Sequence, residues 1–224
     1  MPSLPNAQKV LKDLKVVVRH FNTLGIADQS FDPILLNTGK NQLVQSPVTA
    51  NSAALENIPY DELYQGLDTK QAFLIKLIDG GLMQFDYCFD QHGRRLEKHR
   101  LAYLPAPHLD PYMSLENDYW EGRAFLEVVG HQVVPVPLRV DYDSRPDVAV
   151  SVIHPAAHLT LGQYKHCRIP ISSPMLPMAF AVFIGTHFYS QPGASGFSSL
   201  GSSIPGEFAD SITEEEMLMT HIRV

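Results

Sequence analysis

The sequence predicts an α+β fold, with a mostly antiparallel sheet of about five or six strands covered by an N-terminal helix and a C-terminal core helix. Short β-like runs follow one another through the middle of the chain, and the tight-turn dipeptides Asp-Gly and Gly-Gly separate two of them. Apolar residues recur at helical spacing near the N-terminus. A second, strongly apolar stretch near residue 180 follows two prolines, which favour a helix start.

Composition indicates one compact domain. The chain has 224 residues, of which 45% are hydrophobic and 18% are charged, enough to bury one substantial core. We predict a single domain over residues 1–190, followed over 191–224 by a Ser/Gly-rich connector and a short amphipathic tail. The formal charge of −7 argues against nucleic-acid binding by bulk electrostatics, but a local basic patch can still bind nucleic acid.

Cysteine usage and the N-terminal segment predict the compartment. Cys88 and Cys167 are the two cysteines, too few for a disulfide framework or a four-cysteine zinc site, and this favours a reducing environment. The first residues, MPSLPNAQKVLKDLK, carry prolines and charges where a secretory signal is apolar, and no run approaches the roughly 20 apolar residues of a membrane span. We therefore expect a cytoplasmic protein with no membrane partner.

The N-terminal third predicts two helices around a less regular segment. The first helix runs from Asn6 to a stop at Gly25. Ile26–Ala50 predicts a strand and loops, because its apolar pieces are short and broken. The second helix is expected over Ser52–Gly66, with a kink or break at Pro59.

An antiparallel meander follows, made of Phe73–Ile78, Leu82–Phe89 and Leu96–Leu104. In its second strand, alternation directs Phe85 to a core face and Asp86 to the opposite face. Its third strand carries charge on both sides, as an edge strand or the floor of a polar cleft would.

Three more strands and the core helix complete the predicted domain. The strands are expected at Phe125–Val129, Val133–Val140 and Cys167–Ile171, and the helix lies within Met175–Tyr189. After the connector, the tail from Ile212 onward could pack back on the domain or dock on another protein.

Polar residues gather between the last predicted strands. Alternation places Arg139, Asp141 and Asp143 on one face of a strand. If the following segment turns helically, His154 and His158 share a face at the i, i+4 spacing used by paired metal ligands. No Glu lies between them, and Pro155 allows only a helix start there, so we predict a site without metal or cofactor.

These residues suit phosphodiester chemistry. His158 and His154 can transfer protons at neutral pH, and Asp141 completes the predicted catalytic set. Arg100, Arg139 and Arg168 are the predicted phosphate binders. Such a set suits cleavage of RNA, whose own 2′-hydroxyl serves as the nucleophile. The alternative is structural, because each histidine could also cap a turn or bond a backbone carbonyl.

An ordered set of motifs runs through the chain: Asp79-Gly80, Phe85-Asp86-Tyr87, His99 to Pro105, Arg139-x-Asp141-x-Asp143, His154-Pro155-x-x-His158, Cys167-Arg168-Ile169-Pro170, and Phe183-Ile184 through Phe188-Tyr189. From about residue 60 to 190, this set resembles a bacterial family catalogued only as a domain of unknown function. More distantly, it is similar to the TumE-like toxins of toxin–antitoxin pairs. That resemblance implies that Arg100, Asp141 and His158 occupy the toxin-like polar positions.

Two functions follow as hypotheses. The first is a toxin-like or anti-phage defence RNase or phosphodiesterase acting on RNA. The second is a non-catalytic, protein-binding subunit of a multi-protein defence complex, whose sheet edge and acidic tail bind a protein encoded nearby. Self-association into a homo-oligomer is open under either hypothesis.

Overall fold

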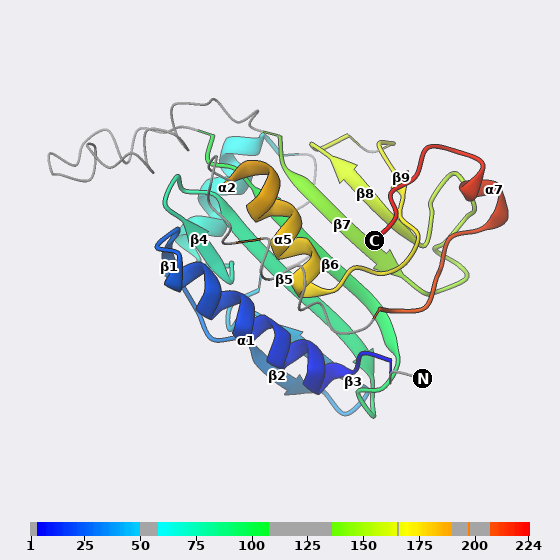
Figure 1. Cartoon of the computed structure of the whole chain (residues 1–224), viewed down its shortest axis with the longest axis horizontal. Coiled ribbons are helices and arrows are strands. Elements are labelled where there is room, and N and C mark those ends of the chain that lie inside the picture. Colours follow the sequence, from blue (N-terminus) through cyan, green and yellow to red (C-terminus); the bar gives the residue numbers. More distant parts are fainter. Residues whose placement is uncertain (1–3, 50–57, 108–135, 165, 190–196, 198–206) are drawn as a thin grey trace, which may run out of the picture.

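The α+β fold is confirmed by the computed structural model, which describes residues 4–49, 58–107, 136–164, 166–189, 197 and 207–224. Over these residues nine strands form one sheet and four helices accompany it (Figure 1). The sheet has more strands than the five or six expected, because the segment before Ala50 forms three short strands whose apolar patterns are weak. Predicted strand Phe125–Val129 lies outside the described residues.

All neighbouring strands pair antiparallel, in the order β1-β4-β5-β6-β7-β8-β9, and β3 pairs with both β5 and β2. β4 pairs with the beginning of β5 and β3 with its end, so the two short strands share one edge of β5. The strands are β1 Ala27–Ser30, β2 Ile34–Asn37, β3 Asn41–Gln45, β4 Ile75–Leu77, β5 Leu82–Asp90, β6 Leu96–Leu104, β7 Leu138–Asp143, β8 Ala157–Leu161 and β9 Ile169–Pro170.

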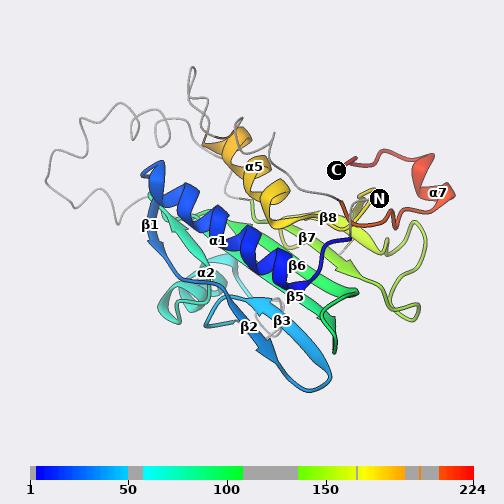
Figure 2. The same cartoon turned by 60° about the horizontal axis from the view of Figure 1, so that its bottom comes forward.

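Two helices cover one face of this sheet. α1 is Ala7–Thr23, and its Asn6 cap accepts a hydrogen bond from the Lys9 amide at 2.9 Å. α5 is Pro177–Phe188, with proline in its first turn as predicted. Both helices cross the same side of the sheet (Figure 1, Figure 2). Their buried side chains and the inward side chains of the strands form the main core.

The opposite face is only partly covered. α2, Tyr60–Thr69, packs Leu63 and Leu67 over one end of the sheet, on the other side from α1 and α5 (Figure 2). Pro59 immediately precedes this helix, which agrees with the predicted break at this residue and not with a kink, and residues 52–57 of the predicted range lie outside the described part of the chain. The rest of this face carries polar side chains.

The C-terminal tail packs back on the domain. Ile222 forms a parallel bridge with Ile171, and the amide of Val224 donates to the Ser172 hydroxyl at 3.1 Å. α7, Glu214–Met217, is a single turn with a capping box. Of the helices that the structure describes, none has the length and apolar character needed to cross a membrane.

Candidate active site

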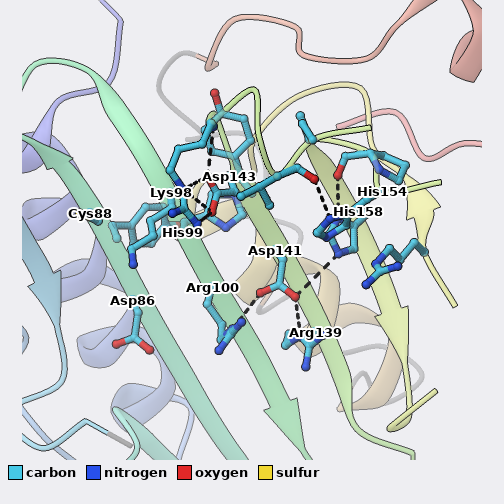
Figure 3. Close-up of a pocket in the computed structure, with 18 of the residues that line it drawn as sticks. Asp86, Cys88, Lys98, His99, Arg100, Arg139, Asp141, Asp143, His154 and His158 are labelled. Carbon is cyan, nitrogen blue, oxygen red and sulfur yellow. Dashed lines mark hydrogen bonds and ion pairs between the residues drawn. The ribbon is translucent and has the colours of Figure 1, made fainter. Parts of the chain in front are cut away.

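One row of ionisable side chains crosses four strands on the open face. Asp86 of β5 is the register partner of Arg100 on β6, which is the partner of Asp141 on β7, itself opposite His158 on β8. Direct cross-strand partners share a face, with their Cα atoms about 5 Å apart. The sheet therefore assembles residues from distant parts of the sequence into one continuous line (Figure 3).

Asp141 lies between two guanidinium groups. Arg100 Nε donates to its Oδ1 at 2.8 Å, and Arg139 Nε donates to its Oδ2 (Figure 3). Burial favours the protonated acid, but the charges of Arg100 and Arg139 outweigh burial and lower the pKa of Asp141. The carboxylate is thus charged at neutral pH, and the three groups together carry one net positive charge.

Among the described residues, the terminal nitrogens of the two guanidinium groups are unused donors. Each bonds Asp141 through Nε, and no described residue accepts a hydrogen bond from the terminal nitrogens of Arg100 or Arg139. Arg100 and Arg139 have side chains that are 36% and 24% exposed. Two guanidinium groups with such donors, held in place by the carboxylate of Asp141, can bind an anionic group such as phosphate.

The two histidines lie side by side, with ring centroids 5.1 Å apart. Nδ1 of His158 is 2.8 Å from the Pro155 carbonyl oxygen, and Nδ1 of His154 is 2.9 Å from that of Val148. Because a carbonyl only accepts, Nδ1 carries the proton in both rings, and Nε2 of each neutral ring keeps its lone pair.

His158 is a neutral imidazole with an available Nε2 atom. This atom is 3.9 Å from Asp141 Oδ2, too far for a hydrogen bond. Burial lowers the pKa of His158, although the Pro155 carbonyl and Asp141 oppose that effect. The ring is 4% exposed and lines the cavity, so at neutral pH it can accept a proton from a bound group.

The segment from His154 to His158 does not turn helically, which was the condition for the two rings to share a helix face. His158 lies on strand β8, and His154 precedes it in a loop that is closed by two backbone hydrogen bonds with Val150. The rings meet because this loop folds against the start of β8. Pro155 is compatible with this loop as well as with a helix start.

All six residues predicted for the site line one cavity of ≈ 630 Å³. They are Arg100, Arg139, Asp141, His154, His158 and Arg168. Lys98 and Arg145 add further positive charge, although Arg145 is paired with Asp143 at 2.7 Å. The structure thus brings the predicted residues together, and their catalytic and binding roles stay predictions.

Asp86 is a cavity residue that was not predicted for the site. Within the described residues its half-buried carboxylate accepts no hydrogen bond, because Arg100 turns its head toward Asp141 instead (Figure 3). Burial raises the pKa of Asp86 to about 6, against the opposing charges of Arg100 and Lys98. The signal in the sequence was its position on the polar face of a core strand, beside Phe85.

His99, by contrast, belongs to the core. It points to the helix-covered face, where its Nε2 accepts a hydrogen bond from the Met175 amide at 3.0 Å. Burial lowers its pKa to about 4, so it stays neutral at physiological pH. It therefore serves to join β6 to the segment before α5.

The C-terminal tail holds the loop that carries His154. Val152 has φ +68°, a strained backbone conformation for a β-branched residue. Its amide donates to Glu216 Oε1 at 3.1 Å, and the neighbouring Ser151 hydroxyl donates to Glu215 Oε2 at 2.8 Å. Because Glu216 is buried and also completes the α7 capping box, the tail fixes this loop beside the cavity.

In the ranges that the structure describes, no group of three or more His, Cys, Asp or Glu side chains has an arrangement that could hold a metal ion. His154 and His158 lie side by side, and the adjacent carboxylate of Asp141 is already bonded to two arginines.

Fold and site together define an antiparallel α+β protein with a basic, histidine-containing cavity on the open face of its sheet. The chain belongs to the uncharacterized conserved protein family DUF2290, whose family model matches residues 26–224. No curated protein and no solved structure matches the chain. The predicted membership of a family of unknown function is thus confirmed, whereas the similarity to TumE-like toxins stays a prediction.

Proposed function

We propose that the cavity binds and cleaves a phosphodiester of RNA, as a toxin-like or anti-phage defence RNase. One observation carries the proposal: two adjacent imidazoles keep their Nε2 atoms available beside two guanidinium groups with free donors. Proton transfer and phosphate binding are the two requirements of cleavage by the substrate's own 2′-hydroxyl.

The neutral Nε2 atom of His158 takes the proton of the 2′-hydroxyl, and the 2′-oxygen attacks the adjacent phosphorus. The bond from phosphorus to the 5′-oxygen breaks, and this step requires His154 to carry a proton on Nε2, which it donates to that oxygen. The products are a 2′,3′-cyclic phosphate and a 5′-hydroxyl. Proton transfer then regenerates both histidines, so the balance requires no metal, oxidant or other reactant.

The arginines hold the phosphate during this step. Arg100 and Arg139 direct their free nitrogens to the non-bridging oxygens, while Asp141 keeps both heads in place. Arg168, at the other side of His158, supplies a third cation from the cavity wall. These cations form a local basic site on a chain whose net charge is −7, so binding depends on this cavity and not on the whole surface.

Inducible expression in a bacterial host tests the proposal. Wild type should slow growth and degrade total RNA, and His158→Ala should reduce RNA cleavage by about 10²–10⁴-fold, the usual contribution of a positioned acid or base. His187→Ala is the matched control, because His187 is exposed on α5 at the opposite face of the sheet. If wild type neither slows growth nor degrades RNA, and His158→Ala only lowers the melting temperature, His158 is a structural residue and the proposal fails.

A second candidate function, protein binding, is favoured by an exposed apolar patch. The loop before His154 and the tail around α7 are joined by the hydrogen bond between Ser151 and Thr213, the residue that caps α7, at 2.8 Å. Together they expose Val150, Val152, Ile153, Met217, Leu218 and Met219. Patches of this kind mark interaction sites, and the exposed acids Glu214 and Glu215 beside this one favour a basic partner surface.

Co-expression with the protein encoded next to this chain tests that candidate. Leu218→Glu should abolish co-purification, because Leu218 is 90% exposed, the most exposed of these apolar side chains. Leu36→Glu, on the exposed part of β2, is the control and should leave the complex intact. Equal recovery of wild type and Leu218→Glu would exclude this patch as the binding surface.

A further inference from the structure

The carboxylate of Asp86 lies in the cavity with nothing to bond among the described residues. Its neighbours are the cations Arg100 and Lys98, and the hydrogen bond that Arg100 forms through Nε goes to Asp141 and not to Asp86. Figure 3 shows Asp86 apart from the network around Asp141, with its carboxylate free. Because this acid lines the cavity and is only partly buried, its two oxygens can accept hydrogen bonds from a ligand that binds there.

The position of Asp86 relative to the phosphate site suggests which part of a ligand it meets. Asp86 is two strands from Asp141, a separation of roughly 10 Å at the usual strand spacing. A nucleobase projects from its phosphate over a comparable distance. A nucleotide whose phosphate lies at Arg100 and Arg139 can therefore place its base over Asp86.

The chemistry of a carboxylate selects among the bases. Two acceptor oxygens side by side pair best with two adjacent N–H donors. Among the four RNA bases, guanine alone presents two neighbouring donors on its Watson–Crick edge, N1–H and the 2-amino group. Adenine and cytosine place an acceptor beside their amino group, and uracil flanks its single donor with two carbonyls.

We propose that Asp86 binds the Watson–Crick edge of a guanine base, which makes the cavity selective for guanine nucleotides. This inference rests on the proposed RNA-binding function and adds its base specificity. The apolar side chain of Leu43 lies on the neighbouring strand at the same cavity wall and can contact the face of the base. A pKa of about 6 keeps Asp86 mostly ionised at pH 7.5, the form that the pairing requires.

Binding of the four ribonucleoside 3′-monophosphates to the full chain at pH 7.5 tests the proposal. The guanine nucleotide should bind about 5- to 150-fold more tightly than the other three, the range that one bidentate base contact gives. Asp86→Asn should remove this preference, because the amide replaces one acceptor by a donor. Asp143→Asn is the matched control: its carboxylate lies in the same cavity but is already bonded to Arg145, so the preference should persist.

RNA cleavage by the same preparations separates this inference from the proposed function. Equal binding of all four nucleotides, or a preference unchanged in Asp86→Asn, overturns the role of Asp86 even if RNA is cleaved. A preference for guanine that depends on Asp86, without any cleavage, supports the base site and overturns the RNase. Failure to bind any of the four nucleotides overturns both.

Discussion

Two neighbouring rows of side chains cross the same four strands and point to opposite faces of the sheet, one row apolar and the other ionisable. Phe85, Leu101, Val140 and Leu159 form one row on the helix-covered face, and all are buried in the main core. Asp86, Arg100, Asp141 and His158 form the other row, one residue along, on the open face. Because successive side chains of a strand point to opposite faces, the same strands supply core residues to one face and ionisable residues to the other.

The difference between the faces arises from what covers them. α1 and α5 exclude water from the first row, whereas α2 covers only one end of the second face (Figure 2). The uncovered part must satisfy its charges by pairing them, as Asp141 does with two arginines. Asp86 is the member of this row that the described residues leave without a hydrogen bond, and for that reason we assign it to a ligand.

The largest expected effect on stability is in the apolar row. Phe85→Ala should lower the free energy of unfolding by about 3–5 kcal/mol, because the deleted ring is fully buried and meets Phe180 edge-on at a centroid distance of 5.7 Å. Urea unfolding measures this loss. A cost below about 1 kcal/mol would mean that this face is not the main core.

A smaller loss is expected from the charged row. Asp141→Asn should cost about 1.5–3 kcal/mol at pH 7, because both arginines lose a charged hydrogen bond. The lowered pKa of Asp141 means that its contribution is present above the unfolded pKa of 3.8 and is lost as pH falls through the folded value. The difference between variant and wild type should therefore shrink below about pH 4; a constant difference would contradict the ion pairing.

Asp86→Asn should change the free energy of unfolding in the opposite direction and stabilise the protein at high pH. Because its pKa is raised in the folded state, the protonated Asp86 contributes stability below the unfolded pKa of 3.8. This contribution is lost as pH rises through about 6. The asparagine variant avoids this loss and should be more stable than wild type by about 1–2 kcal/mol at pH 8, less than the full shift because the side chain is only half buried. Unfolding curves at pH 4 and pH 8 check this, and a variant less stable than wild type at pH 8 would show that Asp86 has a stabilising partner.

The smallest effect is expected at the tail that supports the cavity loop. Thr213→Ala removes the α7 cap and should cost about 1 kcal/mol. Amide exchange at Val152 should accelerate, because Glu216 holds that amide through the same capping box. Thr23→Ala serves as the control, since Thr23 lies at the end of α1 and bonds only the Arg19 carbonyl among the described residues. An unchanged rate of amide exchange at Val152 would show that the tail does not hold the loop in place.

Local patterns predicted the elements that are bounded by strong signals. The range of β6, Leu96–Leu104, was predicted to the residue, because turn residues precede it and a proline follows it. α1 was predicted from its apolar spacing and from Asn6 and Gly25 at its ends. The hairpin of β2 and β3 could not be predicted from the sequence, since its strands are only four and five residues long and neither shows a regular alternation of buried and exposed residues.

The members of the site were easier to predict than their geometry. Arg139 and Asp141 share a face by strand alternation alone, as expected. His154 and His158 were expected to meet on a helix, and they meet instead across a loop and a strand whose fold depends on contacts with β7 and with Glu216. Asp86 could not be selected, because its importance depends on Arg100 turning away from it toward Asp141.

Identification of the cleavage products tests the central claim most directly. The purified full chain is incubated, in the presence of a metal chelator, with a synthetic RNA and with the same oligonucleotide carrying a 2′-deoxy sugar at the cleaved position; mass spectrometry identifies the ends. We predict a 2′,3′-cyclic phosphate and a 5′-hydroxyl from the RNA, no cut at the deoxy position, and product formation about 10²–10⁴-fold slower with His158→Ala. An uncut RNA, or cleavage at the deoxy position, would contradict the assignment of the open face as a 2′-hydroxyl-dependent RNase site.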